Sequence, residues 1–296
     1  MEGRRAMIEA HNVTKFFSVV NEDRTADGAT ALLSVSLTIE DGTIVSLLGP
    51  SGCGKSTFLE ILGGLQEPTE GCVYIDGKTV LEPLPATRRE MIRYRRRHWF
   101  LSPLANSLFR NRPKHDIAMI FQDYAVFPWM TVLQNVTFAL KLRGVKRGER
   151  KRIAREYLRK VGLADSLRKY PSQLSGGMRQ RLALARALSV QPRIILMDEP
   201  FAAVDALTRE RLQDDLLRLW DETGITIVLV THDTDEALYL SDEVVIFSPS
   251  PGVVRNRFSV DLARPRRRTD PELLVLKERI TSLFRYDIIH ESEYSI

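Results

Sequence analysis

The residues of this chain that are best suited to chemistry form a glycine-rich run that ends in a lysine and two hydroxyls. The run Gly-Pro-Ser-Gly-Cys-Gly-Lys-Ser-Thr (residues 49–57) has the spacing G-x-x-x-x-G-K-[ST], after a strand-like stretch and before a helical one. In such a run the glycines let the backbone wrap around phosphates, the lysine contacts the β- and γ-phosphates, and the hydroxyl ligates magnesium. We therefore predict a nucleotide phosphate site with Lys55 on the phosphates and Ser56 on the metal. Its lining residues are predicted to be Gly49, Pro50, Ser51, Gly52, Cys53, Gly54, Lys55, Ser56 and Thr57.

A second glycine-rich segment, Leu-Ser-Gly-Gly-Met-Arg-Gln (residues 174–180), opens an Ala/Leu/Arg-rich helix. The free backbone N–H groups and the positive dipole end of a helix start both favour phosphate. One chain thus carries two half-sites for a triphosphate, and both cannot easily reach one nucleotide from the same subunit. We therefore expect a dimer that holds ATP between its two subunits.

Two adjacent carboxylates, Asp198 and Glu199, follow a short apolar stretch in the run Ile-Ile-Leu-Met-Asp-Glu-Pro (residues 194–200). Adjacent residues on a strand point to opposite sides, so one carboxylate can hold magnesium while its neighbour faces the attacking water. We assign Asp198 to the metal and Glu199 to the water as the general base. Taken alone, such a pair is more often a helix cap or a surface pair, and the phosphate loop favours catalysis instead.

Two polar residues follow other strand-like stretches. Gln122 comes after residues 117–121, and His232 comes shortly after residues 225–230. Open α/β sheets bind their ligands at the carboxyl ends of strands, so both positions argue for a function. A polar residue at such a place is otherwise an ordinary hydrogen-bonded side chain, and the order of the motifs along the chain decides between these interpretations.

The segments around these residues predict an α/β protein. The pair Asp76-Gly77 is typical of a tight hairpin turn and indicates an antiparallel edge sheet. Residues 124–190 are mostly helical in period and predict a helical subdomain, and Asp270-Pro271 predicts the start of a terminal helix. Strand-like patterns occur at residues 7–13, 32–39, 43–48, 72–75, 78–80, 117–121, 193–197 and 225–230.

Composition and apolar run length indicate the compartment in which the chain functions. The 296 residues carry 43 Lys and Arg against 38 Asp and Glu, a formal charge of +5. The longest apolar runs fall well short of the ~20 residues that span a bilayer, and the N-terminus has no secretory signal pattern. A membrane role would therefore come through a partner, and we expect the cytoplasmic face. Cys53 and Cys72 are too few for a disulfide framework and are predicted to be free thiols.

The order of the motifs resembles that of ABC transporter ATPases over about residues 6–260. The phosphate loop, Gln122, the segment 174–180, the Met-Asp-Glu-Pro run, Asp205 and His232 follow one another as in that family. The resemblance implies a P-loop NTPase fold of the ABC ATPase type. That fold has a mixed sheet core, an antiparallel β edge subdomain and an inserted α-helical subdomain.

The resemblance also implies roles for single residues. His232 would hold the γ-phosphate and the attacking water, Gln122 would join magnesium to the helical subdomain, and Asp205 would line the interface between subunits. Phe17 stands where the family places an aromatic ring on adenine, while Phe16 or Phe17 could equally be a core residue. Ser175 and Gly177 would touch the γ-phosphate of ATP bound to the opposite subunit, and Gly176 and Gln180 are also assigned to nucleotide binding.

The segments 121–132, 174–188 and 248–268 resemble bacterial importers of nitrate, sulfonates, taurine or bicarbonate. The resemblance implies ATP and Mg2+ as cofactors and ATP hydrolysis that energises uptake of a small anion. It implies a second ATPase subunit and two permease subunits as partners, and indirectly an extracytoplasmic solute-binding protein. The chain would then lie peripherally on the cytoplasmic face of the inner membrane.

Two other functions share these motifs. An exporter or lipid-transport ATPase has the same catalytic residues, so this function remains an alternative. A nucleic-acid-associated ABC ATPase is suggested by the sequence pI of about 9.2. It is disfavoured because the chain has neither a long coiled coil nor a second tandem ATPase unit, so we expect no nucleic acid partner.

The basic segment 83–115 departs from the family, which usually has a short loop there. We interpret it as a solvated surface insertion, and the alternative is a segment that binds anionic lipid, the permease or a regulator. Our hypothesis is that it tunes coupling without forming the catalytic site. Residues 261–296 are predicted to be a basic hinge and helical extension beyond a 1–260 ATPase domain, with Arg264 and residues 266–268 exposed to solvent.

Overall fold

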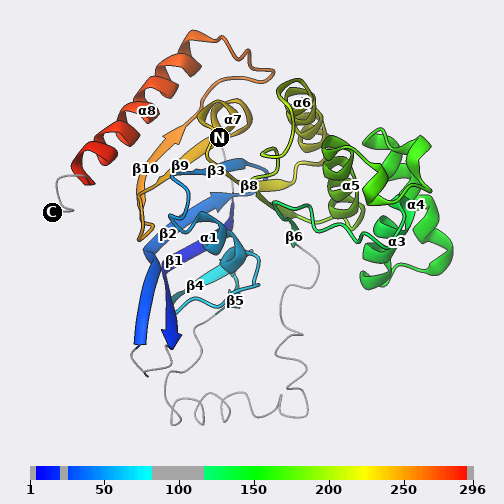
Figure 1. The fold of residues 1–296 in the computed structure, drawn as a ribbon, viewed down its shortest axis with the longest axis horizontal. Helices are drawn as coiled ribbons and strands as arrows, with labels where there is room; N and C mark the ends of the chain where they lie inside the picture. Colours follow the sequence, from blue (N-terminus) through cyan, green and yellow to red (C-terminus); the bar gives the residue numbers. More distant parts are fainter. Residues whose placement is uncertain (1–4, 21–25, 82–116, 292–296) are drawn as a thin grey trace. The chain divides into compact units, whose positions relative to one another are not determined.

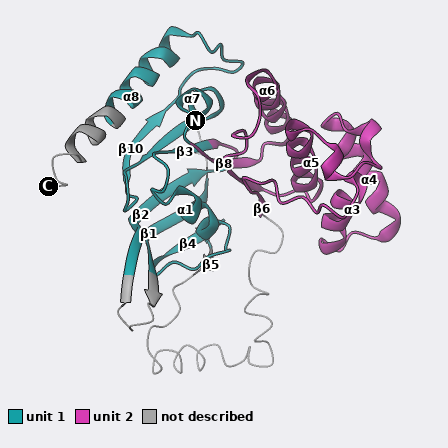
Figure 2. Cartoon of the chain, in the orientation of Figure 1, with its two compact units in different colours: residues 1–41, 45–114, 232–296 teal, residues 42–44, 115–231 magenta. Residues whose placement is uncertain are grey.

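A computed structural model describes residues 5–20, 26–81 and 117–291 of the chain. The insertion expected at residues 83–115 lies outside the described residues. The chain divides into two compact units, which Figure 2 colours separately. Unit 1 consists of Met1–Asp41, Val45–Lys114 and His232–Ile296, and unit 2 consists of Gly42–Ile44 and His115–Thr231.

Unit 1 contains a four-stranded antiparallel sheet in the order β2-β1-β4-β5 (Figure 1). The turn between β4 and β5 is made by Asp76 and Gly77, whose φ angles are +52° and +69°. Both residues therefore adopt the left-handed backbone that a two-residue hairpin of type I′ requires, as predicted from the Asp-Gly pair. The strands are β1 (Ala6–Val20), β2 (Ala26–Glu40), β4 (Glu70–Ile75) and β5 (Lys78–Leu81).

A second group of strands in unit 1 carries the phosphate loop. β3 (Ile44–Leu48) runs parallel to β9 (Glu243–Phe247), and β10 (Val254–Ser259) runs antiparallel to β9, so the sheet is mixed. Every residue of β3 is buried, which explains why its sequence is continuously apolar apart from one serine. The chain passes from β3 through residues 49–54 into α1 (Lys55–Leu62).

The C-terminal helix belongs to unit 1 and does not form a separate part. α8 (Pro271–Glu291) begins with proline at its first position, as predicted, and packs near α7 (Thr234–Leu240). Leu273 and Ile280 of α8 share one buried cluster with Ala237 and Leu238 of α7 and with Leu48 at the end of β3. The extension is therefore continuous with the core that precedes the phosphate loop.

The expectation of a solvated basic hinge is wrong for two of its arginines. Arg266 is buried, with only 4% of its surface exposed, and Arg264 pairs with Asp242. Arg267 is exposed as expected. A short run of charges usually lies in solvent, but here backbone carbonyl groups of preceding residues, between positions 238 and 262, accept hydrogen bonds from the guanidinium groups.

Unit 2 combines a parallel sheet with a helical bundle. β6, β7 and β8 pair in parallel, and α6 crosses between β7 and β8. The strands are β6 (Ile117–Ile120), β7 (Ile194–Asp198) and β8 (Thr226–Thr231). The helices are α3 (Val132–Leu142), α4 (Arg147–Lys160), α5 (Gly176–Ser189) and α6 (Ala206–Thr223), with short 3-10 turns at Ala164–Ser166 and Pro171–Gln173.

Helices α3, α4 and α5 pack against one another, within the interval 124–190 where helical periods dominate the sequence. A capping box starts α3, because Thr131 accepts from the Gln134 backbone and Gln134 accepts in return from the Thr131 backbone. Within the described ranges, no helix is both long and apolar enough to cross a bilayer.

Candidate active site

The phosphate loop of unit 1 needs glycine at specific positions. Gly54 has φ of +96°, and a Cβ atom placed on it would lie 2.4 Å from the carbonyl oxygen of Ala31. Gly52 has φ of +80° and faces open space. Only glycine adopts such angles without strain, so the loop can curve tightly against β2 and turn its backbone outward. This is the geometry that a backbone cradle for phosphate requires.

Lys55 reaches back into the curve of this loop. Its Nζ donates hydrogen bonds to the carbonyl oxygens of Gly49 (2.8 Å) and Pro50 (2.7 Å), and the side chain is 4% exposed. The positive charge is thus held where the loop closes on itself. Ser56 is exposed in the first turn of α1, and Cys53 and Cys72 are free thiols, as predicted.

The aromatic pair on β1 is not part of the core. Phe16 and Phe17 are 44% and 40% exposed, so the alternative that either is a core residue is wrong. The Phe16 ring covers Gly28, where an added Cβ would lie 2.0 Å from Phe16 Cζ. Phe17 pairs with Ala29 of β2, two residues before the Ala31 carbonyl that contacts Gly54. The register thus brings Phe17 close to the phosphate loop, and its contact with adenine stays a prediction.

In unit 2, the carboxylate pair lies at the end of β7, but strand alternation does not separate the two groups. β7 ends at Asp198, and Glu199 has φ of +43° and lies outside the strand. Its N–H still donates to the carbonyl oxygen of Val230, at 3.0 Å. A left-handed backbone is uncommon for glutamate and is typical of functional positions. Strand alternation was therefore the wrong reason for expecting the Asp198 and Glu199 carboxylates to point apart. The left-handed backbone at Glu199 sets the direction of its side chain instead.

Gln122 and Glu199 meet at this edge of the sheet. Ile120 of β6 pairs with Met197 of β7, and Gln122 and Glu199 each lie two residues after this pair, just beyond the ends of the two strands. Gln122 Nε2 donates to Glu199 Oε2 at 3.3 Å. His232 follows β8 directly and is exposed, so it too comes at the carboxyl end of a strand.

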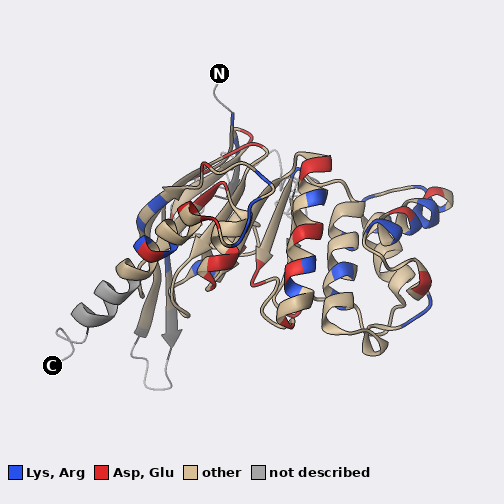
Figure 3. Cartoon of the chain, turned by 90° about the horizontal axis from the view of Figure 1, so that it is seen from above, with Lys and Arg blue, Asp and Glu red and all other residues tan. Residues whose placement is uncertain are grey.

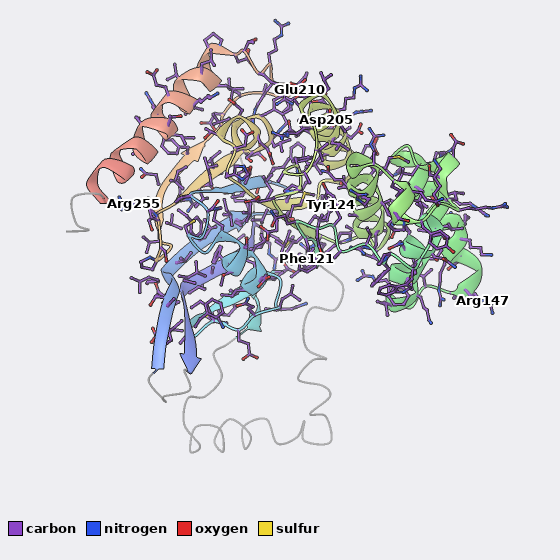
Figure 4. All side chains as sticks on the ribbon, in the orientation of Figure 1. Phe121, Tyr124, Arg147, Asp205, Glu210 and Arg255 are labelled. Atoms are coloured by element: carbon purple, nitrogen blue, oxygen red, sulfur yellow. The ribbon has the colours of Figure 1, made fainter. Side chains whose placement is uncertain are left out.

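The loop after Gln122 is held by an arginine that the sequence did not single out. Tyr124 and Ala125 have φ of +63° and +42°, and Arg186 of α5 donates to both carbonyl oxygens, at 3.0 Å and 2.6 Å. Tyr124 follows β6 in Figure 4. Burial lowers the pKa of Arg186, and the carboxylate of Asp123 opposes that shift. The sequence feature that could have identified Arg186 is its position on the Ala/Leu face of a helix, because a charged residue on an apolar face indicates a buried polar partner.

The segment 174–180 forms a helix start whose glycines are set by packing. Ser175 caps α5 by accepting from the Met178 N–H, at 3.3 Å. A Cβ on Gly176 would lie 3.1 Å from the Ala203 carbonyl oxygen, and one on Gly177 would lie 2.7 Å from Thr208 Cγ2. The first N–H groups of any α-helix have no partner within it, so this start has the donors that an anion site needs.

Gln180 is buried in this structure, and its contact with a nucleotide stays a prediction. Its side chain is 1% exposed and lies inside the unit, one turn into α5. A helix turns by a full circle in 3.6 residues, so position 180 faces the core while Ser175 faces outward.

Asp205 caps α6, whose start touches the segment just described. Asp205 Oδ1 accepts from the Thr208 N–H at 3.1 Å, and this hydrogen bond lowers the pKa of the carboxyl group. Asp205, which Figure 4 labels, is exposed. Leu207, two residues further on, is 73% exposed. An exposed leucine beside an exposed cap agrees with an interface position, which stays a prediction.

Known proteins share this arrangement. Residues 32–202 match the family described as ABC transporter. An ABC transporter ATP-binding protein of Methanocaldococcus jannaschii is 39% identical over 285 residues, covering 96% of this chain and 94% of that protein. The bicarbonate transport ATP-binding protein CmpD of Synechocystis is 36% identical over 279 residues, covering 90% of this chain and 88% of that protein.

A solved structure gives the same result. A dimeric ATP-binding cassette in a post-hydrolysis state, bound to ADP and Pi, is 34% identical with a TM-score of 0.67, covering 87% of this chain and all of that one. The predicted ABC ATPase fold is thereby confirmed. The chain belongs to the ABC transporter family and is an ATPase.

Proposed function

We propose that this chain is the ATP-hydrolysing subunit of an importer for a small anion of the bicarbonate, nitrate, sulfonate or taurine class. The similarity to the bicarbonate transport ATP-binding protein CmpD supports this substrate class. The chain would act through two permease subunits on the cytoplasmic face of the inner membrane, supplied by an extracytoplasmic solute-binding protein.

The hydrogen bond from Gln122 to Glu199 is the observation that carries the catalytic part of the proposal. Glu199 accepts a proton from the attacking water as general base, and the amide of Gln122 orients its carboxylate. Lys55 binds the β- and γ-phosphates, His232 holds the γ-phosphate and the water, and Phe17 stacks on adenine.

The donor chemistry of the chain suits Mg2+. Ser56, Asp198 and Gln122 supply hydroxyl, carboxylate and amide oxygens, and Mg2+ prefers oxygen ligands together with substrate phosphates. When bound, the ion neutralises charge on the phosphates. These three residues are the ones we assign to it.

The active form in this proposal is a dimer. The start of α5, with Ser175, Gly176 and Gly177, binds the γ-phosphate of ATP held by the phosphate loop of the other copy. The exposed Asp205 and Leu207 then lie in the contact between copies. The dimeric state of the ADP-bound cassette supports this assembly.

The permease is proposed to dock on the helical part of unit 2. A pocket of about 340 Å³ opens there, lined by Trp129 and Phe138 and by basic groups that include Lys141, Arg147 and Arg150. α4 carries seven Lys or Arg against two Glu, which Figure 3 shows in blue and red. A pocket lined by aromatic and basic side chains fits a partner helix that has apolar and acidic side chains.

The proposal is tested with the full chain co-expressed with its neighbouring permease and binding-protein genes. Membrane vesicles that contain the complex should take up one of bicarbonate, nitrate, a sulfonate or taurine only with ATP inside, and the isolated chain should hydrolyse ATP. The matched control is Lys55→Ala, which should abolish both. ATP-driven exit of a solute, or of lipid, with no uptake of these anions would contradict the importer function and favour the exporter alternative.

A further inference from the structure

Arg266 makes an unusual set of contacts for a residue in a basic run. Its guanidinium is buried and donates to five backbone carbonyl groups. The acceptors are Leu262 (3.1 Å), Leu238 (2.9 Å), Tyr239 (3.3 Å), Ser241 (2.6 Å) and Val260 (2.9 Å). Nε donates to Leu262, Nη1 to the three carbonyls of Leu238, Tyr239 and Ser241, and Nη2 to Val260, so every nitrogen of the planar guanidinium has a carbonyl acceptor.

Three of these carbonyls belong to the C-terminal end of α7. Leu238, Tyr239 and Ser241 accept from Arg266, and the intervening Leu240 accepts from Arg264 Nη2 at 2.6 Å. The last carbonyls of a helix have no partner within it, and cations are favourable at that end. The two arginines therefore cap four consecutive carbonyl groups at the end of α7.

Further contacts tie α7 to the C-terminal extension. The Arg268 guanidinium lies 3.8 Å from the centre of the Tyr239 ring, and Lys277 Nζ bonds Asp235 at 2.7 Å. Leu273 and Ile280 of α8 share the buried cluster with α7. α7 has seven residues, too few for a helix to be stable alone, so these contacts decide its position.

The other end of α7 begins next to His232. Asp233 caps the helix by accepting from the N–H groups of Asp235 (2.9 Å) and Glu236 (3.1 Å), and His232 is the residue before this cap. A seven-residue helix is about 10 Å long and makes only about two turns, so a tilt at its C-terminal end also moves its N-terminal end, which follows His232.

We propose that Arg266 is a positioning residue for ATP hydrolysis, which fixes α7 and through it the side chain of His232. This inference rests on the proposed function, in which His232 holds the γ-phosphate and the attacking water. Burial of a charge is a poor way to gain stability compared with apolar packing. A planar, five-donor cap is instead a precise way to fix the orientation of a short helix.

The electrostatic state of Arg266 agrees with this role. Burial lowers its pKa to about 10, with the neighbouring Arg264 adding to the shift and Asp242 and Asp261 opposing it. The group therefore remains charged at neutral pH. Lysine in its place has three donors and no planar fork, so it could satisfy only part of the carbonyl set.

The test is a double-mutant cycle in the full-length chain, with kcat and KM for ATP measured in single-turnover and steady-state assays. Arg266→Met should lower kcat about tenfold and leave KM unchanged, and Arg266→Lys should lower kcat about threefold. The exposed neighbour provides the matched control, and Arg267→Met should behave as wild type. In the His232→Ala background, neither Arg266 variant should lower kcat further.

The outcomes distinguish a failure of the positioning role of Arg266 from a failure of the proposed role of His232. Unchanged kcat in both Arg266 variants overturns the positioning role, as does a loss that persists undiminished in the His232→Ala background. If Arg266→Met does not fold, the Arg266→Lys cycle decides in the same way. Wild-type kcat in His232→Ala alone contradicts the proposed role of His232, whatever the Arg266 variants do.

Discussion

Gln122 and Glu199 are joined by a 3.3 Å hydrogen bond from Nε2 to Oε2, across the carboxyl ends of the paired strands β6 and β7. The register of the two strands places both residues two positions beyond the pair Ile120 and Met197. Gln122 also begins the loop that Arg186 holds to α5. A shift of that loop therefore changes the surroundings of the Glu199 carboxylate.

Glu199→Gln should abolish hydrolysis but not binding. The amide keeps the shape of the side chain and cannot accept a proton from water, so kcat should fall by at least about 100-fold. Size-exclusion chromatography with light scattering should then show a dimer with ATP and a monomer without it. Normal turnover in this variant would remove Glu199 from the role of general base.

Arg186→Met should destabilise the protein and loosen the loop after Gln122. It leaves the carbonyl groups of Tyr124 and Ala125 without their charged donor, and the free energy of unfolding should fall by about 3 kcal/mol in urea titrations. The matched control is Arg181→Met on the same helix, whose partly exposed pair with Asp215 contributes less than about 1 kcal/mol. Equal losses in the two variants would contradict the special role of Arg186.

Gly177→Ala should destabilise the start of α5 by overpacking. The new methyl would meet Thr208 Cγ2 at 2.7 Å, and such contacts cost about 1 to 3 kcal/mol. Thr208→Ser removes that methyl and keeps the hydroxyl. The double variant should therefore recover most of the stability lost in Gly177→Ala, as measured by thermal unfolding. If the two losses simply add, the steric explanation is wrong.

Local patterns were enough to predict much of the fold and of the site. The Asp76-Gly77 turn, Pro271 at a helix start and the helix that opens within residues 174–180 depend on a few neighbouring residues, so local sequence reveals them. The carboxyl ends of parallel strands share one edge, which is why Gln122 could be placed at the site before its partner was known.

The errors came from contacts between distant parts of the chain. The burial of Arg266 depends on carbonyl groups about 25 residues earlier, and the left-handed turn at Glu199 depends on β8. Gln180, like Gly177, is buried, and only the packing of α5 shows that both face inward. Periodicity identifies an apolar face, but it does not identify a polar group whose partner lies elsewhere.

The cap of α6 predicts a pH dependence of stability. The pKa of Asp205 is lowered in the folded chain by the hydrogen bond from Thr208, below its ordinary value of 3.8. The ionised carboxylate therefore stabilises the fold fully above about pH 4, and this stabilisation is lost as the pH falls through the folded pKa. Asp205→Asn keeps a cap oxygen but cannot ionise, so wild type should be more stable than the variant at pH 7. The difference should shrink in urea titrations carried down to pH 3.

Asp221→Asn, near the C-terminal end of the same helix, should show no such loss, because a carboxylate there faces the negative end of the helix dipole. A difference between wild type and Asp205→Asn that stays constant from pH 7 to pH 3 would contradict the ionised cap.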